Sequence, residues 1–282
     1  MTTDPGTLYV VATPIGNLAD ISARAREVLR TAVVVAAEDT RRAGQLLTAL
    51  GLKNRLLSLH EHNEESRVDE VLATLRSGGD VALISDAGTP LISDPGYRIV
   101  ERVRRESLPV SPIPGCCAAI AALSVSGLPT DRFRFEGFLP ARPVARRNRL
   151  KMLVDVSETL ICYESVHRIA AVLADIEAVI GAERPIALLR EMTKLYETIY
   201  RGTVVQVRRQ LAADPGGGKG EFTLVIGGAP ERDSVPPQEL KRVVEILLQS
   251  VSASQAASLA AEITGVKKRD AYRLATELKV RD

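Results

Sequence analysis

Short apolar runs and amphipathic segments alternate regularly over residues 7–114, and this alternation constrains the fold more than any other feature. The apolar runs are rich in valine, leucine and isoleucine and are typical of buried strands, whereas the segments between them have helical spacing, as at Ile21, Ala25 and Leu29. Strands are predicted at 7–13, 33–39, 55–60, 80–86 and 108–114, and helices at 21–32, 40–51, 66–78 and 97–107. This order predicts βαβ units and a parallel sheet covered on both faces.

The rest of the chain predicts a second α/β region and a helical tail. Predicted strands lie at 132–140, 159–165, 184–191 and 220–230, with an unassigned segment "TIYRGT" before the last of them, and predicted helices lie at 116–127 and 166–181. Several of these strands have no helix between them, so more antiparallel pairing is expected than in the first region. Residues 214–220 have the composition of a loop, and residues 231–282 show helical spacing without a strand pattern. The predicted domains are 1–115, 116–230 and 231–282.

The bulk composition describes an ordinary globular protein of 282 residues. The net charge of +2 does not indicate a polyanionic partner, so any contact with nucleic acid must come from local basic patches. The three cysteines form no disulfide framework, since Cys116 and Cys117 are adjacent, which favours reduced thiols and a cytoplasmic location. No apolar run is long enough for a membrane span, and no membrane partner is expected.

The segment "VALISDAGTPLISDPGY" (81–97) is the strongest local signal for a ligand site. A buried strand ends at Asp86 and enters a loop that contains Gly88 and Asp94. Ligands of open α/β sheets bind beyond the carboxyl ends of the strands. Gly88 allows close approach of the backbone, and the two aspartates accept hydrogen bonds from an amine or hydroxyl. The alternative is a tight connection with capping aspartates.

Other strand ends show weaker signals of the same kind. "TPIGN" (13–17) and "PIPGCCAAIAA" (112–122) suit either a flat ligand or tight helix–sheet packing. "AAEDTRR" (36–42) gathers acids and bases that either orient a substrate or cap the next helix. No loop matches a P-loop or a G-x-G-x-x-G fingerprint, so neither a nucleoside triphosphate nor NAD is indicated.

Two of the three histidines, His60 and His62, lie in "LHEHNE". They would share one side of an extended segment, but a zinc site needs further ligands that the chain does not offer, and no metal is expected. A polar cluster near Asp39 and Asp86 is the preferred interpretation, with either histidine as a base or a contact to a polyanionic substrate.

A cation-rich stretch at residues 141–151 indicates contact with RNA phosphates, although a solvated helix face is the usual explanation of such a pattern. We count Arg41 with it, so that the predicted RNA-binding residues are Arg41, Arg142, Arg146, Arg147, Arg149 and Lys151. The tail has nearly balanced charges, and DNA is not an expected partner.

Taken together, the motifs resemble the ribosomal RNA small-subunit methyltransferase I group of the tetrapyrrole-methylase superfamily, the class III S-adenosylmethionine methyltransferases. The resemblance rests on "TPIGNLADIS", "AAEDTRR", "LHEHNE", "SDAGTPLISDPG", "PGCCAAIAALSVSGLPTDRFRFEGFLP", "YESVHR", "REMTKLYET" and "GEFTLVIGG", in this order over about residues 7–228. It implies two α/β domains with a cofactor cleft between them, usually in a homodimer. The implied reaction is 2′-O-methylation of a cytidine ribose in the decoding region of 16S ribosomal RNA.

The same resemblance implies roles for individual residues. The implied contacts to S-adenosylmethionine are Pro14, Ile15, Gly16, Asp86, Ala87, Gly88, Thr89, Pro90, Cys117, Ala118, Ala119, Tyr163, Gly227 and Gly228. The candidates for a proton acceptor are Glu38, Asp39, His60 and His62. Cys116 and Cys162 depart from the family pattern of proline and an aromatic residue. The alternatives are C-methylation of a tetrapyrrole on the same fold and a non-catalytic ribosome-assembly factor.

Overall fold

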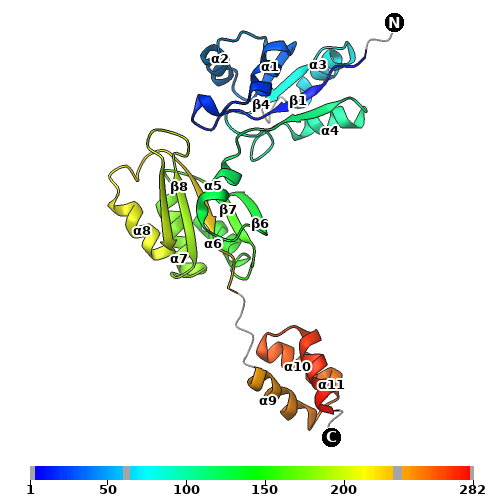
Figure 1. Ribbon diagram of the computed structural model, residues 1–282, viewed down its shortest axis with the longest axis vertical. Coiled ribbons are helices and arrows are strands. Elements are labelled where there is room, and N and C mark those ends of the chain that lie inside the picture. Colours follow the sequence, from blue (N-terminus) through cyan, green and yellow to red (C-terminus); the bar gives the residue numbers. More distant parts are fainter. Residues whose placement is uncertain (1–3, 60–63, 231–236, 280–282) are drawn as a thin grey trace. The chain divides into compact units, whose positions relative to one another are not determined.

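The structure is a computed structural model that describes residues 4–59, 64–230 and 237–279 (Figure 1). It divides into two compact units. One comprises Met1–Val154 and Glu158–Gly227 and contains both sheets, and the other comprises Asp155–Ser157 and Gly228–Asp282 and contains the C-terminal helices. The predicted boundaries at residues 115 and 230 stay predictions.

The first sheet has five parallel strands in the order β3-β2-β4-β1-β5, which confirms the predicted parallel α/β arrangement. Its elements are β1 (Leu8–Val11), η1 (Leu18–Asp20), α1 (Ala23–Thr31), β2 (Val34–Ala37), α2 (Thr40–Ala49), β3 (Leu56–Ser58), α3 (Glu64–Arg76), β4 (Val81–Ile84), α4 (Tyr97–Arg105) and β5 (Val110–Ile113). All four residues of β2 and of β4 are buried, because α1 and α2 cover one face of the sheet and α3 and α4 the other. The carboxyl ends of the strands therefore meet at one edge.

The second sheet has the order β6-β7-β10-β8-β9, and only the β6–β7 pair is parallel. Its elements are α5 (Ala118–Ser126), β6 (Phe133–Phe138), α6 (Pro143–Lys151), β7 (Thr159–Ser165), α7 (Ile169–Val179), β8 (Pro185–Arg190), β9 (Thr198–Thr203), α8 (Val204–Ala213) and β10 (Glu221–Ile226). The expected antiparallel pairing is thus confirmed. The helix α5 packs on this sheet through Ala119, Ala122 and Leu123.

Helix α8 was not among the predicted elements. It begins with a capping box, in which the Thr203 hydroxyl accepts a hydrogen bond from the Gln206 N–H and the Gln206 side chain accepts one from the Thr203 N–H. Val204, Val207 and Leu211 are buried at helical spacing along one face. Residues 214–220 form the expected loop between α8 and β10.

The second unit packs three helices, α9 (Pro237–Leu248), α10 (Ala253–Thr264) and α11 (Lys268–Lys279), as Figure 1 shows. The hydrophobic cluster of this unit contains Val244 and four fully buried alanines, Ala257, Ala260, Ala271 and Ala275. Small side chains let the helices approach closely. Within the three described stretches, no helix is both long and apolar enough to cross a bilayer.

Candidate functional site

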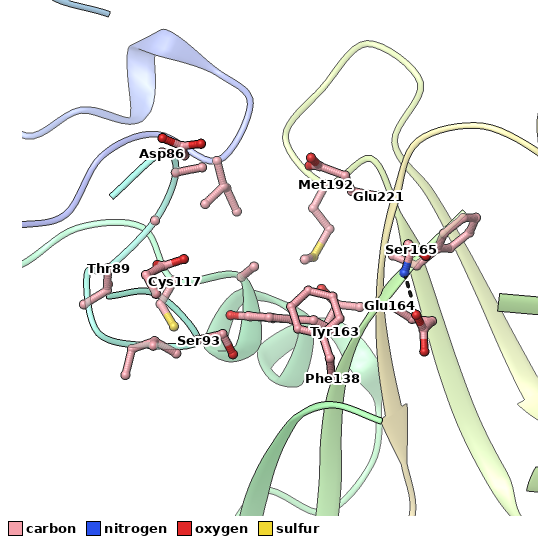
Figure 2. Close-up of a pocket in the computed structure, with 18 of the residues that line it drawn as sticks. Asp86, Thr89, Ser93, Cys117, Phe138, Tyr163, Glu164, Ser165, Met192 and Glu221 are labelled. Carbon is pink, nitrogen blue, oxygen red and sulfur yellow. Dashed lines mark hydrogen bonds between the residues drawn. The ribbon is translucent and has the colours of Figure 1, made fainter. Parts of the chain in front are cut away.

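A pocket of about 430 Å³ lies in the unit that contains both sheets, and segments from both halves of that unit line it. Figure 2 shows Asp86 and Thr89 on one side, Met192, Ser165 and Glu221 on the other, and Tyr163 and Phe138 at the bottom of the view. The lining residues are Ile15, Glu38, Arg42, Asp86, Ala87, Gly88, Thr89, Ile92, Ser93, Asp94, Cys117, Ala118, Phe138, Tyr163, Glu164, Ser165, Glu191, Met192, Lys194, Glu221, Phe222 and Thr223.

The first wall of the pocket is held together by the Asp86 carboxylate, just after β4. One of its oxygens accepts a hydrogen bond from the Asp39 N–H at 3.2 Å, and the other pairs with the Arg42 guanidinium at 3.1 Å. Asp39 and Arg42 belong to the segment after β2. The carboxylate therefore ties the ends of two neighbouring strands together at the rim of the pocket.

Gly88 joins the same wall to the end of β1. Its N–H and C=O form a pair of hydrogen bonds with Thr13, at 3.1 and 2.9 Å. Its φ of +82° favours glycine, and a Cβ added there would lie 3.4 Å from a methyl group of Ile15. The Thr89 hydroxyl donates to the Cys116 carbonyl at 2.9 Å. Three segments that follow different strands of the first sheet thus meet at one pocket wall.

Backbone strain is concentrated on both sides of the pocket. Among the residues that the structure describes, five non-glycine residues have a positive φ between 53° and 72°, and only Ser107 of these lies away from the two pocket segments 91–93 and 191–193. Leu91 and Ser93 follow the Gly88 turn, and Glu191 and Thr193 follow β8. Such conformations cost roughly 1–3 kcal/mol each and are typical of ligand-binding segments.

Asp94 is the pocket carboxyl with the most perturbed protonation. Burial raises its pKa to about 6, a hydrogen bond with Ser85 opposes the shift, and the charge of Asp86 adds to it. A carboxyl with this pKa is poised between its neutral and charged forms near neutral pH. A cationic ligand in the pocket would favour the charged form.

The second wall contains an aromatic pair on β6 and β7. Tyr163 packs edge-to-face against Phe138, with ring centroids 5.9 Å apart, and its hydroxyl accepts a hydrogen bond from the Ala119 N–H at 3.1 Å. That bond gives a partner to a backbone N–H in the first turn of α5, where the residue before the helix, Cys117, makes no side-chain cap. Burial raises the pKa of the Tyr163 hydroxyl well above its ordinary value, so it stays protonated.

The rest of the second wall comes from the turn after β8 and from the adjacent strands. Lys194 bridges two acids, with its ammonium 2.8 Å from the Glu191 carboxylate and 3.0 Å from that of Glu221. On β7, Glu164 is 3% exposed and lies 3.2 Å from the Arg168 guanidinium. Burial raises the pKa of Glu164. Asp94 was singled out from the sequence together with Asp86, and Arg42 belongs to the candidate segment 36–42. The other lining residues Phe138, Glu191, Met192, Lys194 and Glu221 were not among the predicted site residues.

Several predicted cofactor contacts come together at the pocket and others do not. Ile15, Asp86, Ala87, Gly88, Thr89, Cys117, Ala118 and Tyr163 line it. Pro14, Gly16, Pro90 and Ala119 adjoin lining residues in the chain but are not part of the lining. Gly227 lies beyond the other end of β10, where its N–H donates to the Pro185 carbonyl at 2.8 Å. Gly228 belongs to the other compact unit.

The four candidate proton acceptors have different surroundings. Glu38 lines the pocket. Asp39 caps α2, because its carboxylate accepts the Arg41 N–H at 2.8 Å and pairs with the Arg41 guanidinium at 2.7 Å. These bonds hold the pKa of Asp39 well below its ordinary value, which makes it a poor base. His60 and His62 lie outside the described residues.

Several arginines of the cation-rich stretch at 141–151 form ion pairs within the fold, which the sequence of the stretch did not indicate. Arg146 is 3% exposed, and its guanidinium lies 2.6 Å from the Asp175 carboxylate. The prediction that Arg146 contacts RNA is therefore wrong, because its charge is buried and paired. Arg147 also pairs with Asp175, at 3.2 Å, and Arg149 pairs with Glu136 at 2.6 Å. Arg41, Arg142 and Lys151 are exposed and stay predictions.

Two protein-family models together match most of the chain. The model of the Tetrapyrrole (Corrin/Porphyrin) Methylases covers residues 7–208, and that of the RsmI C-terminal HTH domain covers residues 234–279. The ribosomal RNA small subunit methyltransferase I of Xylella fastidiosa strain Temecula1 is 48% identical, over 95% of this chain and 98% of its own. The protein of that name from Escherichia coli O157:H7 is 47% identical, over 96% of this chain and 95% of its own.

Solved structures share the fold at lower identity. The uroporphyrin-III-C-methyltransferase of Thermus thermophilus matches with a TM-score of 0.55 and 24% identity, over 79% of this chain and 94% of its own. The cobalt precorrin-4 methyltransferase CbiF matches with a TM-score of 0.58 and 20% identity, over 78% of this chain and 94% of its own. The chain therefore belongs to the tetrapyrrole methylase family, and within it to the S-adenosylmethionine-dependent group of ribosomal RNA small subunit methyltransferase I proteins.

Proposed function

We propose that this protein methylates 16S ribosomal RNA with S-adenosylmethionine, at the ribose 2′-hydroxyl of a cytidine in the decoding region. The names of relatives that are 44–49% identical over nearly the whole chain support an rRNA substrate. The observation that carries the proposal is the pocket, since its acids and apolar side chains fit the methyl donor and its rim offers a proton acceptor.

The residues of the pocket fit S-adenosylmethionine in size and in chemistry. Its volume of about 430 Å³ falls within the range of roughly 300–1,000 Å³ that small-molecule sites occupy. Ile15, Ile92 and Met192 offer apolar surface for a flat base, and the carboxylates of Asp86 and Asp94 offer acceptors for an amine or ribose hydroxyls. When bound, the cofactor supplies a methyl group on a positively charged sulfur, which is displaced in line by a nucleophile.

The chain's own contribution is to orient the ligands and to accept a proton. A ribose hydroxyl is a weak nucleophile, so a positioned base accelerates its attack. Glu38 is our first candidate, because it lines the pocket next to the Asp86 wall. His60 and His62, which lie outside the described residues, are the other candidates, and Asp39 ranks last because of its bonds to Arg41.

A methyl-transfer assay on unmethylated 30S subunits, with a radiolabelled methyl donor, tests this function. We expect label in 16S rRNA and, after digestion, a single 2′-O-methylcytidine in the decoding region. Transfer to a porphyrin precursor with none to the subunit would contradict the RNA substrate. Calorimetry that detects no binding of S-adenosylmethionine or S-adenosylhomocysteine would contradict the enzyme assignment.

Three variants assign the proton acceptor in the same assay. Glu38→Gln should reduce turnover by roughly 10²–10⁴-fold, the usual contribution of a general base, with cofactor binding retained. The matched variants His60→Ala and His62→Ala report on the alternative. Full turnover of Glu38→Gln would exclude Glu38 as the base.

The proposal also includes a homodimer and a cytoplasmic location. Large apolar side chains at Phe133, Val144 and Met152 are exposed, and burial of such groups is a common reason for self-association. Light scattering in solution should give twice the chain mass of 30.4 kDa. A mass of one chain would contradict the dimer.

A further inference from the structure

The last helix of the chain, α11, carries a cationic face. This α11 face consists of Lys268, Arg269, Tyr272, Arg273, Thr276 and Lys279, all of which are exposed. Their spacing places them on one side of the helix. Ala271 and Ala275, on another side, are buried against α9 and α10. The face therefore points away from the core of the helical unit.

The cations of the α11 face are less neutralised than those of other cation-rich helices. In α4, Arg105 lies 2.8 Å from Glu101 and Arg102 lies 3.7 Å from Glu106. In α6, the arginines pair with Asp175 and Glu136. Among the described residues, the only ion pair of the α11 face is the loose one between Arg269 and Asp270, at 3.8 Å.

An aromatic side chain lies among these cations. Tyr272 is 49% exposed. Cations neutralise phosphates without regard to sequence, and an exposed aromatic ring stacks on an unpaired base. The combination suits a nucleic acid strand with accessible bases better than an acidic protein surface.

We infer that the α11 face is an RNA-binding surface, separate from the methyl-transfer pocket, that binds a single-stranded or loop region of the ribosomal RNA substrate. The choice of RNA rests on the proposed function. The surface itself rests on the exposed cations and on Tyr272. The helical unit thus adds affinity for the substrate without a part in the chemistry.

Binding of the full chain to a fluorescent 16S rRNA fragment of the decoding region, measured at several salt concentrations without methyl donor, tests the inference. The double variant Arg269→Gln/Arg273→Gln should lower the slope of log affinity against log salt by about 1.4–1.8, for two lost phosphate contacts. Between about 50 and 200 mM salt, the variant should then lose roughly tenfold less affinity than the wild-type chain.

The same unit offers a matched control. Lys241→Gln/Arg242→Gln removes two exposed cations from α9, where Lys241 lies 3.6 Å from Glu245. This control should leave the slope unchanged. An equal effect of both double variants would overturn the inference, because it would report only the loss of net charge.

A second variant tests the aromatic contact. Tyr272→Leu should weaken RNA binding by at least about fivefold, the lower end of what a base–aromatic stack contributes, and leave the salt slope unchanged. Duplex DNA of the same length should compete poorly. Competition by duplex DNA at equal concentration, or unchanged RNA binding by both α11 variants, would overturn the inference.

The two proposals fail in different ways. Failure of the proposed function appears as absent methyl transfer to 30S subunits by the wild-type chain. Failure of the α11 inference appears as unchanged RNA affinity in the variants, whatever the transfer assay gives. Calorimetry should find the same S-adenosylmethionine affinity in wild type and α11 variants, and circular dichroism should find the same helix content, which shows that the helical unit of the variants is folded.

Discussion

The wall that the first half of the chain contributes to the pocket consists of strand-end loops and carboxylates, whereas the second half contributes side chains from strands and a strained turn. The first wall is fixed by backbone and carboxylate bonds, such as those of Gly88 with Thr13 and of Asp86 with Asp39. The second is fixed by side-chain packing, as between Phe138 and Tyr163, and by the ion pairs of Lys194.

This difference follows from the topology of the two sheets. In a parallel sheet every strand delivers its following loop to the same edge, so polar residues after different strands converge. In the mixed second sheet, all neighbouring strands except β6 and β7 run in opposite directions, and the pocket receives strand interiors as well as turns. We expect substitutions in the first wall to affect ligand binding most, and substitutions in the second wall to affect binding and stability more modestly.

The largest effect is expected from Asp86→Ala. The substitution removes a carboxylate from the pocket together with its bonds to the Asp39 N–H and Arg42. Hydrogen bonds to charged groups are worth roughly 1.5–3 kcal/mol, so S-adenosylmethionine affinity should fall by about 10- to 100-fold in calorimetry. Asp86→Asn keeps an acceptor for the Asp39 N–H and should lose less S-adenosylmethionine affinity than Asp86→Ala. Equal affinity in Asp86→Ala and wild type would show that the first wall does not hold the cofactor.

The second largest effect is expected from the protonation of Asp94, which should change the affinity for the cofactor. Its pKa of about 6 in the folded chain means that it is largely neutral at pH 5. The cofactor carries positive charge and favours the ionised form, so wild-type affinity should fall below pH 6 by up to about tenfold per pH unit. Asp94→Asn removes this dependence, and calorimetry between about pH 5 and pH 7.5 measures it. Parallel pH profiles of the two proteins would contradict the prediction.

Without ligand, the same group affects stability with the opposite sign. The pKa of Asp94 is about 6 in the folded chain and near its ordinary 3.8 when unfolded, so the folded state binds more protons between these values. Stability therefore falls as the pH rises through this window. Asp94→Asn should raise the melting temperature by a few degrees at about pH 7.5 and by nothing at about pH 4. A variant that is less stable at both pH values would contradict the raised pKa.

The first wall could be predicted from sequence because its residues lie at strand ends that local patterns reveal. Asp86 and Gly88 follow a buried apolar run, and the parallel-sheet rule brings that loop to the ligand edge. The residues of the second wall could not be predicted in this way, except Tyr163, which was predicted from the family motif. Glu191 and Lys194 reach the pocket only because of how β8 and β10 pair and because the turn after β8 adopts positive φ values.

The sequence also did not reveal which acidic residues, distant in the chain, pair with the arginines of residues 141–151. Residues 141–151 contain no acid, so the sequence alone favoured a free cationic surface. The acids that pair with Arg146 and Arg149 lie at Asp175 on α7 and Glu136 on β6. Helix α8 was missed for a different reason. Its capping box and its valines at helical spacing are present in the sequence, but the segments on either side of it have the apolar pattern of strands.

A moderate effect is expected from Tyr163→Phe in the second wall. The variant removes the acceptor of the Ala119 N–H, a bond worth about 1 kcal/mol, and should lower the melting temperature by about 2–4 °C. Because the hydroxyl lies in the pocket lining, cofactor affinity should also fall by about threefold to tenfold. Tyr200→Phe is the matched control, since it loses a bond to Asp214 away from the described pocket lining and should change stability alone. Equal cofactor affinity in both variants would remove Tyr163 from the cofactor site.

The smallest effect is expected from Lys194→Ala at the rim of the second wall. The ammonium pairs with Glu191 and Glu221, but Glu221 is 80% exposed at its side chain, and water screens such pairs. The loss of stability should therefore stay below about 1 kcal/mol in denaturant unfolding. The pairs lower the pKa of Glu191 and raise that of Lys194, so their contribution disappears when the pH falls through the pKa of Glu191 or rises through that of Lys194. About 1 M salt, with a Debye length near 3 Å, should bring the variant and wild type closer together. A loss that is larger than that of Tyr163→Phe and insensitive to salt would mean that the second wall depends on this ion pair rather than on packing.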